Sequence, residues 1–241
     1  MKRLKNFLFL LAAVPVVTFA SEAGPRLDKA PVNLADQESL QRGARTFVNY
    51  CLNCHSAAYQ RWNRLTDLGL TEQQIKANLM FGTDKIGSTM TVAIDRRDAA
   101  EWFVAAPPDL TLVARVRGGD WLYTYLRGFY RDDTKPTGWN NVAFPNVVMP
   151  HVLWQLQGVQ AAESHGKESH GPVKLKLERP GAQSAADYDR TVRDLVNFLV
   201  YLGEPARETR MRLGIIVVLF LTVVMLPLAY LLKKEFWKDV H

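Results

Sequence analysis

Cys51-Leu52-Asn53-Cys54-His55 decides the fold of this 241-residue chain. Two thiols three residues apart, with a histidine directly after them, have the spacing of c-type haem attachment. Both thiols can add to the vinyl groups of one porphyrin, while a short helical turn aims the imidazole of His55 at the iron. Cys51 and Cys54 are the only cysteines, so no thiol remains for a disulfide or for a second haem of this type. The sequence therefore predicts one covalently attached haem c.

Two other chemistries use closely spaced cysteines, namely a thioredoxin-like dithiol and half of a zinc site. A redox dithiol normally follows a strand, whereas the residues before Cys51 have a helical pattern. A closed zinc site needs four ligands, and the chain has no further cysteine to supply them. Both alternatives are disfavoured against haem.

The N-terminal segment has the pattern of a secretory signal peptide. Three basic residues precede an apolar run over residues 7–17, and small residues ending at Ala20 or Ala23 offer a cleavage site. An uncleaved anchor is the alternative, but the run is too short to span a bilayer comfortably. We expect a signal peptide over residues 1–20, with cleavage after residue 23 as the second choice.

The other end of the chain predicts a transmembrane helix. Residues 213–232 contain no charge, and 20 residues at about 1.5 Å each match a hydrocarbon core about 30 Å thick. Pro227 lies inside this run, where lipid-embedded helices tolerate proline. Three lysines among residues 233–241 favour a cytoplasmic tail, because the export signal commits the bulk of the chain to translocation. We therefore expect a single-pass protein of the bacterial inner (cytoplasmic) membrane, with residues 21–210 in the periplasm.

The formal net charge of +6 does not indicate a nucleic-acid partner. Residues 21–210 carry 23 Lys and Arg against 22 Asp and Glu, so the excess lies in the two ends. Basic residues at those ends determine membrane topology. We expect the lipid bilayer as a partner and no nucleic acid.

The region between the two ends has a helical pattern throughout. Asp36 can cap a helix that runs into the haem motif, with one apolar face formed by Leu40, Ala44, Phe47, Val48 and Cys51. Gly43 inside this helix costs about 1 kcal/mol relative to Ala, which suggests that another element approaches closely. The candidate is a helix after Ser184, where Asp187 completes a capping box and where Gly203 and Pro205 end the helix.

Shorter helices are predicted after Thr71, Asp95 and Asp109, and around residues 121–129. No alternating pattern predicts a strand. Residues 158–186 have no periodicity and are expected to form an exposed insertion.

The sixth iron ligand determines the chemistry of a c-type haem. Ligation by a methionine raises the reduction potential and leaves no open position, whereas an open position allows ligand binding or peroxide chemistry. The residue pattern alone leaves Met80, Met90, Met149 and His151 as candidates.

Several motifs together resemble one known family, the cytochrome c1 family, in its bacterial form. Cytochrome c1 is the haem c subunit of the quinol:cytochrome c oxidoreductase, or cytochrome bc1 complex. The resemblance extends from about Leu40 to the C-terminus and rests on residues 40–44, 47–56, 106–115, 144–150 and 196–205, followed by a single anchor. It implies an all-α, class I cytochrome c-like haem domain with one C-terminal transmembrane helix.

The resemblance also implies roles for individual residues. His55 and Met149 are the two iron ligands, Arg117 is the better match to an arginine that pairs with a haem propionate, and Arg115 is the second match. A family aromatic beside the propionates is replaced by Trp121 or displaced to Tyr123. The implied cofactor-binding residues are Cys51, Cys54, His55, Met149, Arg117, Arg115 and Pro107.

The function implied by the resemblance is electron relay. The family accepts an electron from the Rieske iron–sulfur protein and passes it to a soluble or membrane-bound cytochrome c, while cytochrome b handles the quinol. No acid, base or nucleophile constellation stands out in the chain, so we expect an electron carrier that is not an enzyme by itself. The alternatives are a stand-alone membrane-anchored c-type cytochrome that serves an oxidase or reductase, and a haem enzyme or gas sensor with an open iron site.

Overall fold

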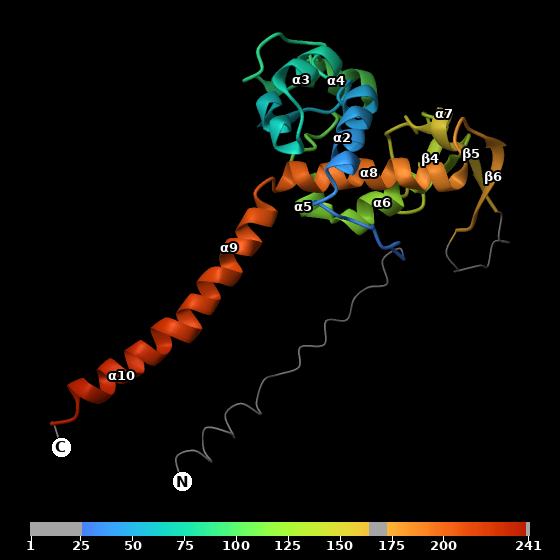
Figure 1. The fold of residues 1–241 in the computed structure, drawn as a ribbon. Helices are drawn as coiled ribbons and strands as arrows, with labels where there is room; N and C mark the ends of the chain where they lie inside the picture. Colours follow the sequence, from blue (N-terminus) through green and yellow to red (C-terminus); the bar gives the residue numbers. More distant parts are fainter. Residues whose placement is uncertain (1–25, 164–172, 240–241) are drawn as a thin grey trace.

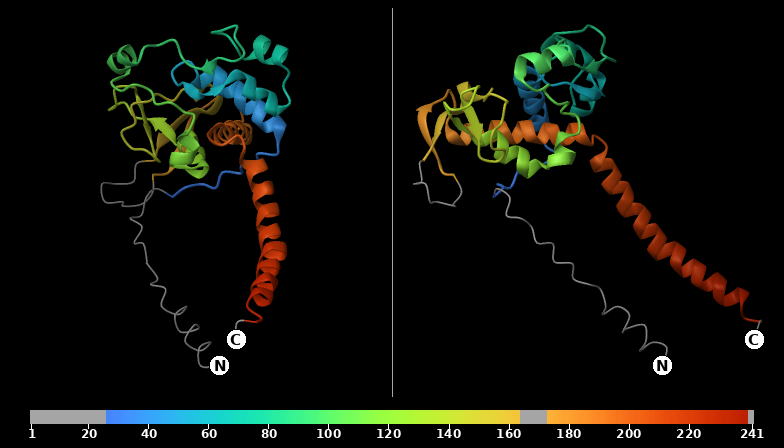
Figure 2. Two further views of the ribbon diagram at one scale, coloured as in Figure 1. Left: turned by 90° about the vertical axis from the view of Figure 1, so that its left-hand side faces the viewer. Right: turned by 180° about the vertical axis from the view of Figure 1, so that it is seen from behind.

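The computed structural model describes residues 26–163 and 173–239, so the signal peptide predicted at residues 1–20 lies outside it (Figure 1). The fold is built around α8 (Ala185–Gly203), which lies between α2 (Gln37–Thr46) on one side and α5 (Val113–Arg117) and α6 (Gly119–Arg127) on the other. Figure 2 shows α8 end-on at the centre of this arrangement. Helices predominate in the described residues, as expected for the predicted class.

The two long helices begin where the sequence predicts. Asp36 accepts a hydrogen bond from the backbone N–H of Ser39 and caps α2, and Ser184 accepts one from the N–H of Asp187 and caps α8. The chain continues from α2 into a π-helical turn, η1 (Phe47–Cys51), which ends at the first cysteine of the haem motif. The helix that precedes this motif is thereby confirmed.

The core lies between α2 and α8. Phe47 packs against Phe198 with ring centroids 5.6 Å apart, and Val192, Leu195 and Val196 on α8 are fully buried. Burying a large apolar side chain stabilises the fold by about 1.5–3 kcal/mol. The apolar faces predicted for the two helices are therefore the faces that form the core.

The shorter helices agree with the sequence in most places. Thr71 and Gln74 form a capping box and Asp95 caps its helix, whereas Asp109 caps no helix because α5 begins only at Val113. The helix predicted after Asp109 is α5, and it begins only at Val113 because the Asp109 carboxylate binds backbone N–H groups of a loop. The remaining helices are η2 (Trp62–Leu68), α3 (Glu72–Asn78), α4 (Arg96–Phe103) and α7 (Trp154–Gln157).

Two small sheets accompany the helices, although no alternating pattern in the sequence indicated their strands. One sheet pairs β1 (Ala57–Arg61) with β2 (Thr89–Met90) in antiparallel fashion. The other has the strand order β4-β3-β5-β6, in which β3 is antiparallel to β4 and parallel to β5. Its strands are β3 (Phe129–Arg131), β4 (Trp139–Asn141), β5 (Gly158–Ala162) and β6 (Leu175–Pro180).

The region 158–186, expected to be an irregular exposed insertion, contains part of this second sheet. β6 is largely exposed, but it pairs with β5 along its whole length. The amide of Gln160 donates to the carbonyl oxygens of Arg127 and Phe129, which fixes β5 against the end of α6. These partners are far away in sequence, so periodicity within the segment does not reveal them.

A single long helix leaves the domain at its C-terminal end. α9 (Arg207–Phe220), the π-helical turn η3 (Leu221–Met225) and α10 (Leu226–Phe236) are continuous, and they form one helix that is long and apolar enough to cross a membrane. Its most apolar window has a mean hydropathy of 2.9 and no residue buried within the protein. The predicted span, residues 213–232, lies within this helix.

Pro227 accounts for the π-helical turn. Proline has no backbone N–H to donate and its ring crowds the preceding turn, so the helix widens just before it. The hydroxyl of Thr222 donates to the carbonyl oxygen of Val218 at 2.8 Å. This bond gives a hydrogen-bond donor to a backbone carbonyl near the π-helical turn.

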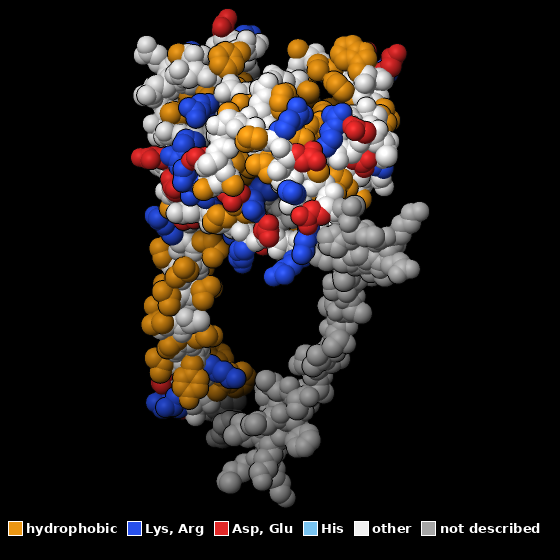
Figure 3. Space-filling model, turned by 90° about the vertical axis from the view of Figure 1, so that its right-hand side faces the viewer, with side chains coloured by type: hydrophobic (Ala, Val, Ile, Leu, Met, Phe, Trp, Pro, Cys, Tyr) orange, Lys and Arg blue, Asp and Glu red, His pale blue; other side chains and the backbone are white. Residues whose placement is uncertain are grey.

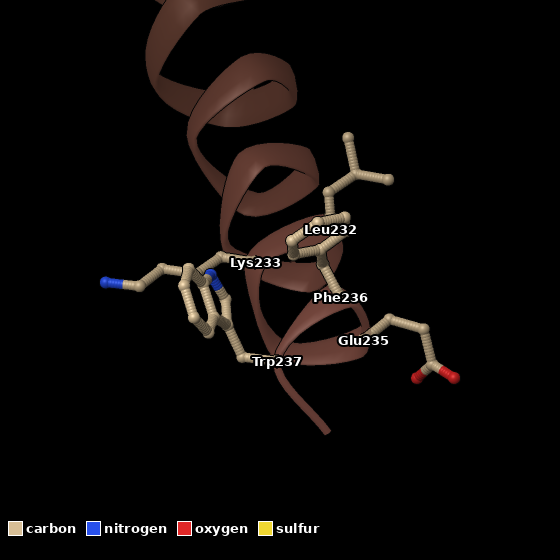
Figure 4. Close-up of a pocket in the computed structure, with 5 residues that line it drawn as sticks. All are labelled: Leu232, Lys233, Glu235, Phe236 and Trp237. Carbon is tan, nitrogen blue, oxygen red and sulfur yellow. The ribbon is translucent and has the colours of Figure 1, made fainter. Parts of the chain in front are cut away.

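The surface changes character along this helix. Figure 3 shows hydrophobic side chains covering it, with Lys and Arg on the domain above and at the far end. Lys233, Glu235, Phe236 and Trp237 lie close together at that far end (Figure 4), and the two aromatic ring centroids are 5.8 Å apart. Aromatic and basic side chains of this kind are typical of a membrane–water interface.

Candidate haem site

The haem motif forms a tight turn at the end of η1. The N–H groups of Cys54 and His55 both donate to the carbonyl oxygen of Cys51, at 3.1 and 2.8 Å. This is the short helical turn predicted from the spacing. It brings both thiols and the imidazole to one short segment at the end of a helix that is packed into the core.

The two cysteines are free thiols, and their surroundings disfavour a redox dithiol. Cys51 is buried, and burial raises the pKa of its thiol to about 12, with a smaller contribution from Cys54. A reactive dithiol needs the opposite shift, toward the thiolate. In the described residues no three or more His, Cys, Asp or Glu side chains lie together as the ligands of a metal ion would.

The ring of His55 is oriented by one hydrogen bond. Its Nδ1 lies 2.7 Å from the carbonyl oxygen of Pro108. A carbonyl oxygen can only accept, so Nδ1 carries the proton and Nε2 keeps a lone pair for a metal. Burial lowers the pKa of His55, against smaller raising effects of the Pro108 carbonyl and the Asp109 carboxylate, which keeps the imidazole in its neutral form. Histidine ligands in metal sites are commonly fixed in this way.

The loop that carries Pro108 is tied to the residues that follow the haem motif. The N–H of Leu110 donates to the carbonyl oxygen of Ser56 at 2.8 Å, and the N–H of Ala58 donates to the Asp109 carboxylate at 2.7 Å. Asp109 also accepts from the N–H of Thr111, which closes the loop on itself. These bonds hold the Pro108 carbonyl in place against the imidazole.

The family resemblance implies that Pro107 in this loop binds the cofactor. In the structure its neighbour Pro108 is the residue that contacts His55. Pro107 is half-buried and stands directly before the residue that binds His55. The role of Pro108 was missed because a backbone carbonyl has no residue type to signal it. Asp109, whose carboxylate closes the loop, is the one nearby residue whose type gives a signal for this loop.

Met149 lies half-buried beside the aromatic side of α6. The hydroxyl of Tyr125 donates to its sulfur at 3.3 Å. Burial raises the pKa of the Tyr125 phenol, so this hydroxyl stays protonated. The other methionine candidates are core residues: Met90 is fully buried on β2 and Met80 is buried after α3.

His151, the remaining candidate, packs between aromatic side chains. Its ring stacks on Phe129 with centroids 4.8 Å apart and planes 5° apart, and it meets the edge of Trp139 at 5.2 Å. Burial lowers the pKa of His151 to about 4, and nearby Gln157 opposes this weakly. Its Nε2 is buried without a hydrogen bond of good geometry, so the neutral ring acts as an aromatic core residue.

The structure separates the two candidate arginines. Arg115 pairs with Glu204 at 3.4 Å, and Glu204 also accepts a hydrogen bond from Arg210 at 2.6 Å, at the junction between the domain and the terminal helix. Arg117 takes part in no ion pair within the described residues, and its guanidinium lies 5.0 Å from the ring centroid of Trp121.

Trp121 connects Arg117 to the methionine side of the site. Its ring stacks on that of Tyr125 at 4.8 Å and 11°, and Tyr125 in turn contacts Met149. Tyr123 lies under Arg127, with 4.5 Å between guanidinium and ring, and is not part of this stack. Of the two aromatics considered for the place beside the propionates, Trp121 is therefore the one that lies next to Arg117.

The residues present fit a c-type haem. Two free thiols at attachment spacing and an imidazole with a fixed tautomer lie in one short turn, and the half-buried thioether of Met149 lies beside α6. Arg117, which has no ion pair among the described residues, lies against Trp121. Together with a terminal helix that is long and apolar enough to cross a membrane, these residues are the ones expected of a membrane-anchored c-type cytochrome.

Comparison with known proteins identifies the family. Residues 28–169 and 175–240 match the model of the Cytochrome C1 family. The chain is 51% identical to cytochrome c1 of Allochromatium vinosum over all of both chains, and 30% identical to cytochrome c1 of Rhodospirillum rubrum over 85% of this chain and 83% of that one. It is also 48% identical, over all of both chains, to a Nitrosomonas europaea protein named ammonia monooxygenase gamma subunit.

This chain belongs to the cytochrome c1 family. Cytochrome c1 is the electron-transfer subunit of the cytochrome bc1 complex, and membership implies haem c as its cofactor. The family predicted from the motifs is confirmed.

Proposed function

We propose that this chain carries a single haem c, attached covalently through Cys51 and Cys54, and relays electrons within a cytochrome bc1 complex. His55 and Met149 are the proposed iron ligands. The observation that carries the proposal most strongly is the hydrogen bond from His55 Nδ1 to the Pro108 carbonyl, because it frees Nε2 at the end of an attachment motif.

The protein residues have separate tasks in this relay. When bound, the haem supplies a reversible one-electron couple of its iron. Cys51 and Cys54 fix the position of the group, and the Pro108 carbonyl holds the ring of His55 in one tautomer. As the second ligand, the thioether of Met149 would favour the reduced state of the group and would exclude other ligands. No proton has to be transferred by the chain itself.

The partners follow from membership of the family. The proposed electron donor is the Rieske iron–sulfur protein, the acceptor is a soluble or membrane-bound cytochrome c, and cytochrome b carries out the quinol chemistry of the reductase. This chain is then a carrier within an oxidoreductase complex and has no enzymatic activity by itself.

The proposed topology places residues 21–210 in the periplasm and residues 213–232 in the bacterial inner membrane. The helix over Arg207–Phe236 supports this placement by its length and apolar surface. Residues 233–241 form the cytoplasmic tail, and residues 1–20 are removed as a signal peptide. A tether of this kind keeps the haem near its partners and replaces a search through the periplasm by a local one.

Purification of the full chain in mild detergent tests the proposal. We expect a haem that stays with the denatured polypeptide, b-type haem and an iron–sulfur subunit in the same complex, and quinol-dependent reduction of the c-type haem. A c-type cytochrome that purifies alone would indicate the stand-alone alternative. Because a relative of similar identity is named ammonia monooxygenase gamma subunit, co-purification with monooxygenase subunits instead would also overturn the assignment.

A further inference from the structure

Tyr125 has a polar contact that is unusual for a core tyrosine. Its hydroxyl donates to the sulfur of Met149 at 3.3 Å. A thioether is a weak acceptor, so a buried phenol usually prefers a carbonyl oxygen. Tyr188 does so, donating to the carbonyl oxygen of Leu126 at 2.8 Å.

Two aromatic neighbours contact the ring of Tyr125 and thereby fix the direction of its hydroxyl. It stacks on Trp121 at 4.8 Å and meets Phe129 edge-on at 5.0 Å and 69°. These contacts restrict both side-chain torsions of the tyrosine, because aromatic pairs prefer stacked or edge-to-face geometry. The hydroxyl therefore keeps one direction without help from the sulfur.

Asn141 connects Tyr125 with the loop that carries Met149. Its amide nitrogen donates to the Tyr125 carbonyl oxygen at 2.7 Å, and its oxygen accepts from the N–H groups of Ala143 and Phe144. The start of the loop that carries Met149 is thus hydrogen-bonded to Tyr125, whose hydroxyl donates to the Met149 sulfur.

We propose that Tyr125 is a positioning residue for Met149, whose hydrogen bond fixes the thioether for the iron and raises the reduction potential. The inference rests on the proposed role of Met149 as iron ligand. A methionine side chain has three rotatable bonds, so a fixed donor restricts the sulfur to fewer positions. A sulfur that shares one lone pair with a hydroxyl also gives less electron density to the iron, which disfavours the oxidised form.

Tyr125→Phe in the purified complex tests this role, since phenylalanine keeps the ring contacts and removes only the hydroxyl. We expect a lower midpoint potential and about three- to tenfold tighter binding of added imidazole to the oxidised protein, as expected for the loss of one hydrogen bond that holds the native ligand. Tyr188→Phe is the matched control, because it removes a buried hydroxyl that does not touch Met149. Its potential and imidazole affinity should equal those of the parent.

Two further variants separate an effect through the sulfur from a structural one. In a Met149→His background the added Tyr125→Phe change should leave the potential unaltered, because no sulfur remains to accept the bond. An equal shift in both backgrounds would overturn the inference. Should Tyr125→Phe accumulate poorly, difluorotyrosine at position 125, a stronger donor, should raise the potential, and an unchanged potential would count against the inference.

The outcomes also distinguish this inference from the assignment on which it rests. A lowered potential in Met149→Leu together with a parental potential in Tyr125→Phe would overturn the role of Tyr125 and leave the ligand in place. A parental potential in Met149→Leu would remove Met149 as ligand, and the role of Tyr125 with it.

Discussion

Gly43 on α2 and Asp194 on α8 lie so close together that no side chain fits between them. A Cβ atom built on Gly43 would overlap the carbonyl oxygen of Asp194 and lie only 2.7 Å from the Cβ of Phe198. The glycine in the middle of a helix, which costs about 1 kcal/mol in helix propensity, is explained by this contact. It sets the spacing of the two helices that form the core.

Gly43→Ala should therefore destabilise the domain although alanine is the better helix former. Separating two packed helices costs about 1–3 kcal/mol, which equals or exceeds the gain of about 1 kcal/mol in helix propensity. We expect earlier unfolding in denaturant, followed by circular dichroism. Gly87→Ala is the control, since nothing lies within 4 Å of a Cβ there, and a parental midpoint for both variants would contradict the close packing.

Asp194 itself is a buried carboxylate whose protonation should control acid stability. Burial raises its pKa, but hydrogen bonds from Arg42, Ser39 and Arg193 outweigh this and leave the pKa below its usual value. A carboxylate with a lowered pKa adds stability above its unfolded pKa of about 4, and that stability is lost as the pH falls through the folded value.

Asp194→Asn should then be about 1.5–3 kcal/mol less stable at pH 7, because a buried carboxylate loses its charge-assisted hydrogen bonds with two partly exposed arginines. The variant should also lose less stability than the parent as the pH falls from about 5 through the usual carboxylate pKa of about 4 and below it, because the folded pKa of Asp194 is lowered. Denaturant titrations over that range check both points. Asp133→Asn, which removes an exposed partner of Arg131, should cost about 0–1 kcal/mol, and an equal cost in both variants would contradict the burial argument.

Local signals in the sequence were sufficient to predict the long helices and the turn of the haem attachment motif. Asp36 and Ser184 cap their helices as predicted, and a glycine at position 43 correctly indicated a close approach from the second helix. The caps depend on neighbours a few residues away, and the cost of a glycine within a helix is likewise a local signal. The pairing of β3 with β5 depends on residues about 30 positions apart, so the segment alone did not reveal it.

Some residues of the candidate site could be predicted from the sequence pattern, some only from the family resemblance, and some from neither. The cysteines and His55 follow from their spacing, whereas Met149 was favoured over other methionines only through the family resemblance. The family resemblance favoured Arg117 over Arg115, and the structure adds the ion pair of Arg115 with Glu204 and the contact of Arg117 with Trp121. The Pro108 carbonyl and the Tyr125 hydroxyl depend on how the loops fold and could not be predicted from spacing.

Met149→Leu should lower the potential by on the order of 0.1 V, because axial-ligand identity changes haem potentials over about 0.8 V. The iron should then bind carbon monoxide. His151 is two residues away, but its ring is stacked on Phe129 and buried, so we expect no replacement ligand from it. Redox titration and absorption spectra check this, with Met90→Leu as the control in the core. A low-spin spectrum without carbon monoxide binding would show that another side chain takes the position.

The last prediction concerns the two arginines. A positive charge near the haem disfavours the oxidised, more positive iron, so Arg117→Gln should lower the potential, by on the order of tens of millivolts for an exposed charge. Arg115→Gln should have a smaller effect, because Glu204 already balances that charge. Arg117→Lys keeps the charge and loses the flat contact with Trp121, so it should retain most of the parental potential. Redox titrations of the three variants at low ionic strength provide the comparison. A larger shift for Arg115→Gln than for Arg117→Gln would reverse the assignment, since the propionate charge would then depend on the arginine at the junction with the terminal helix.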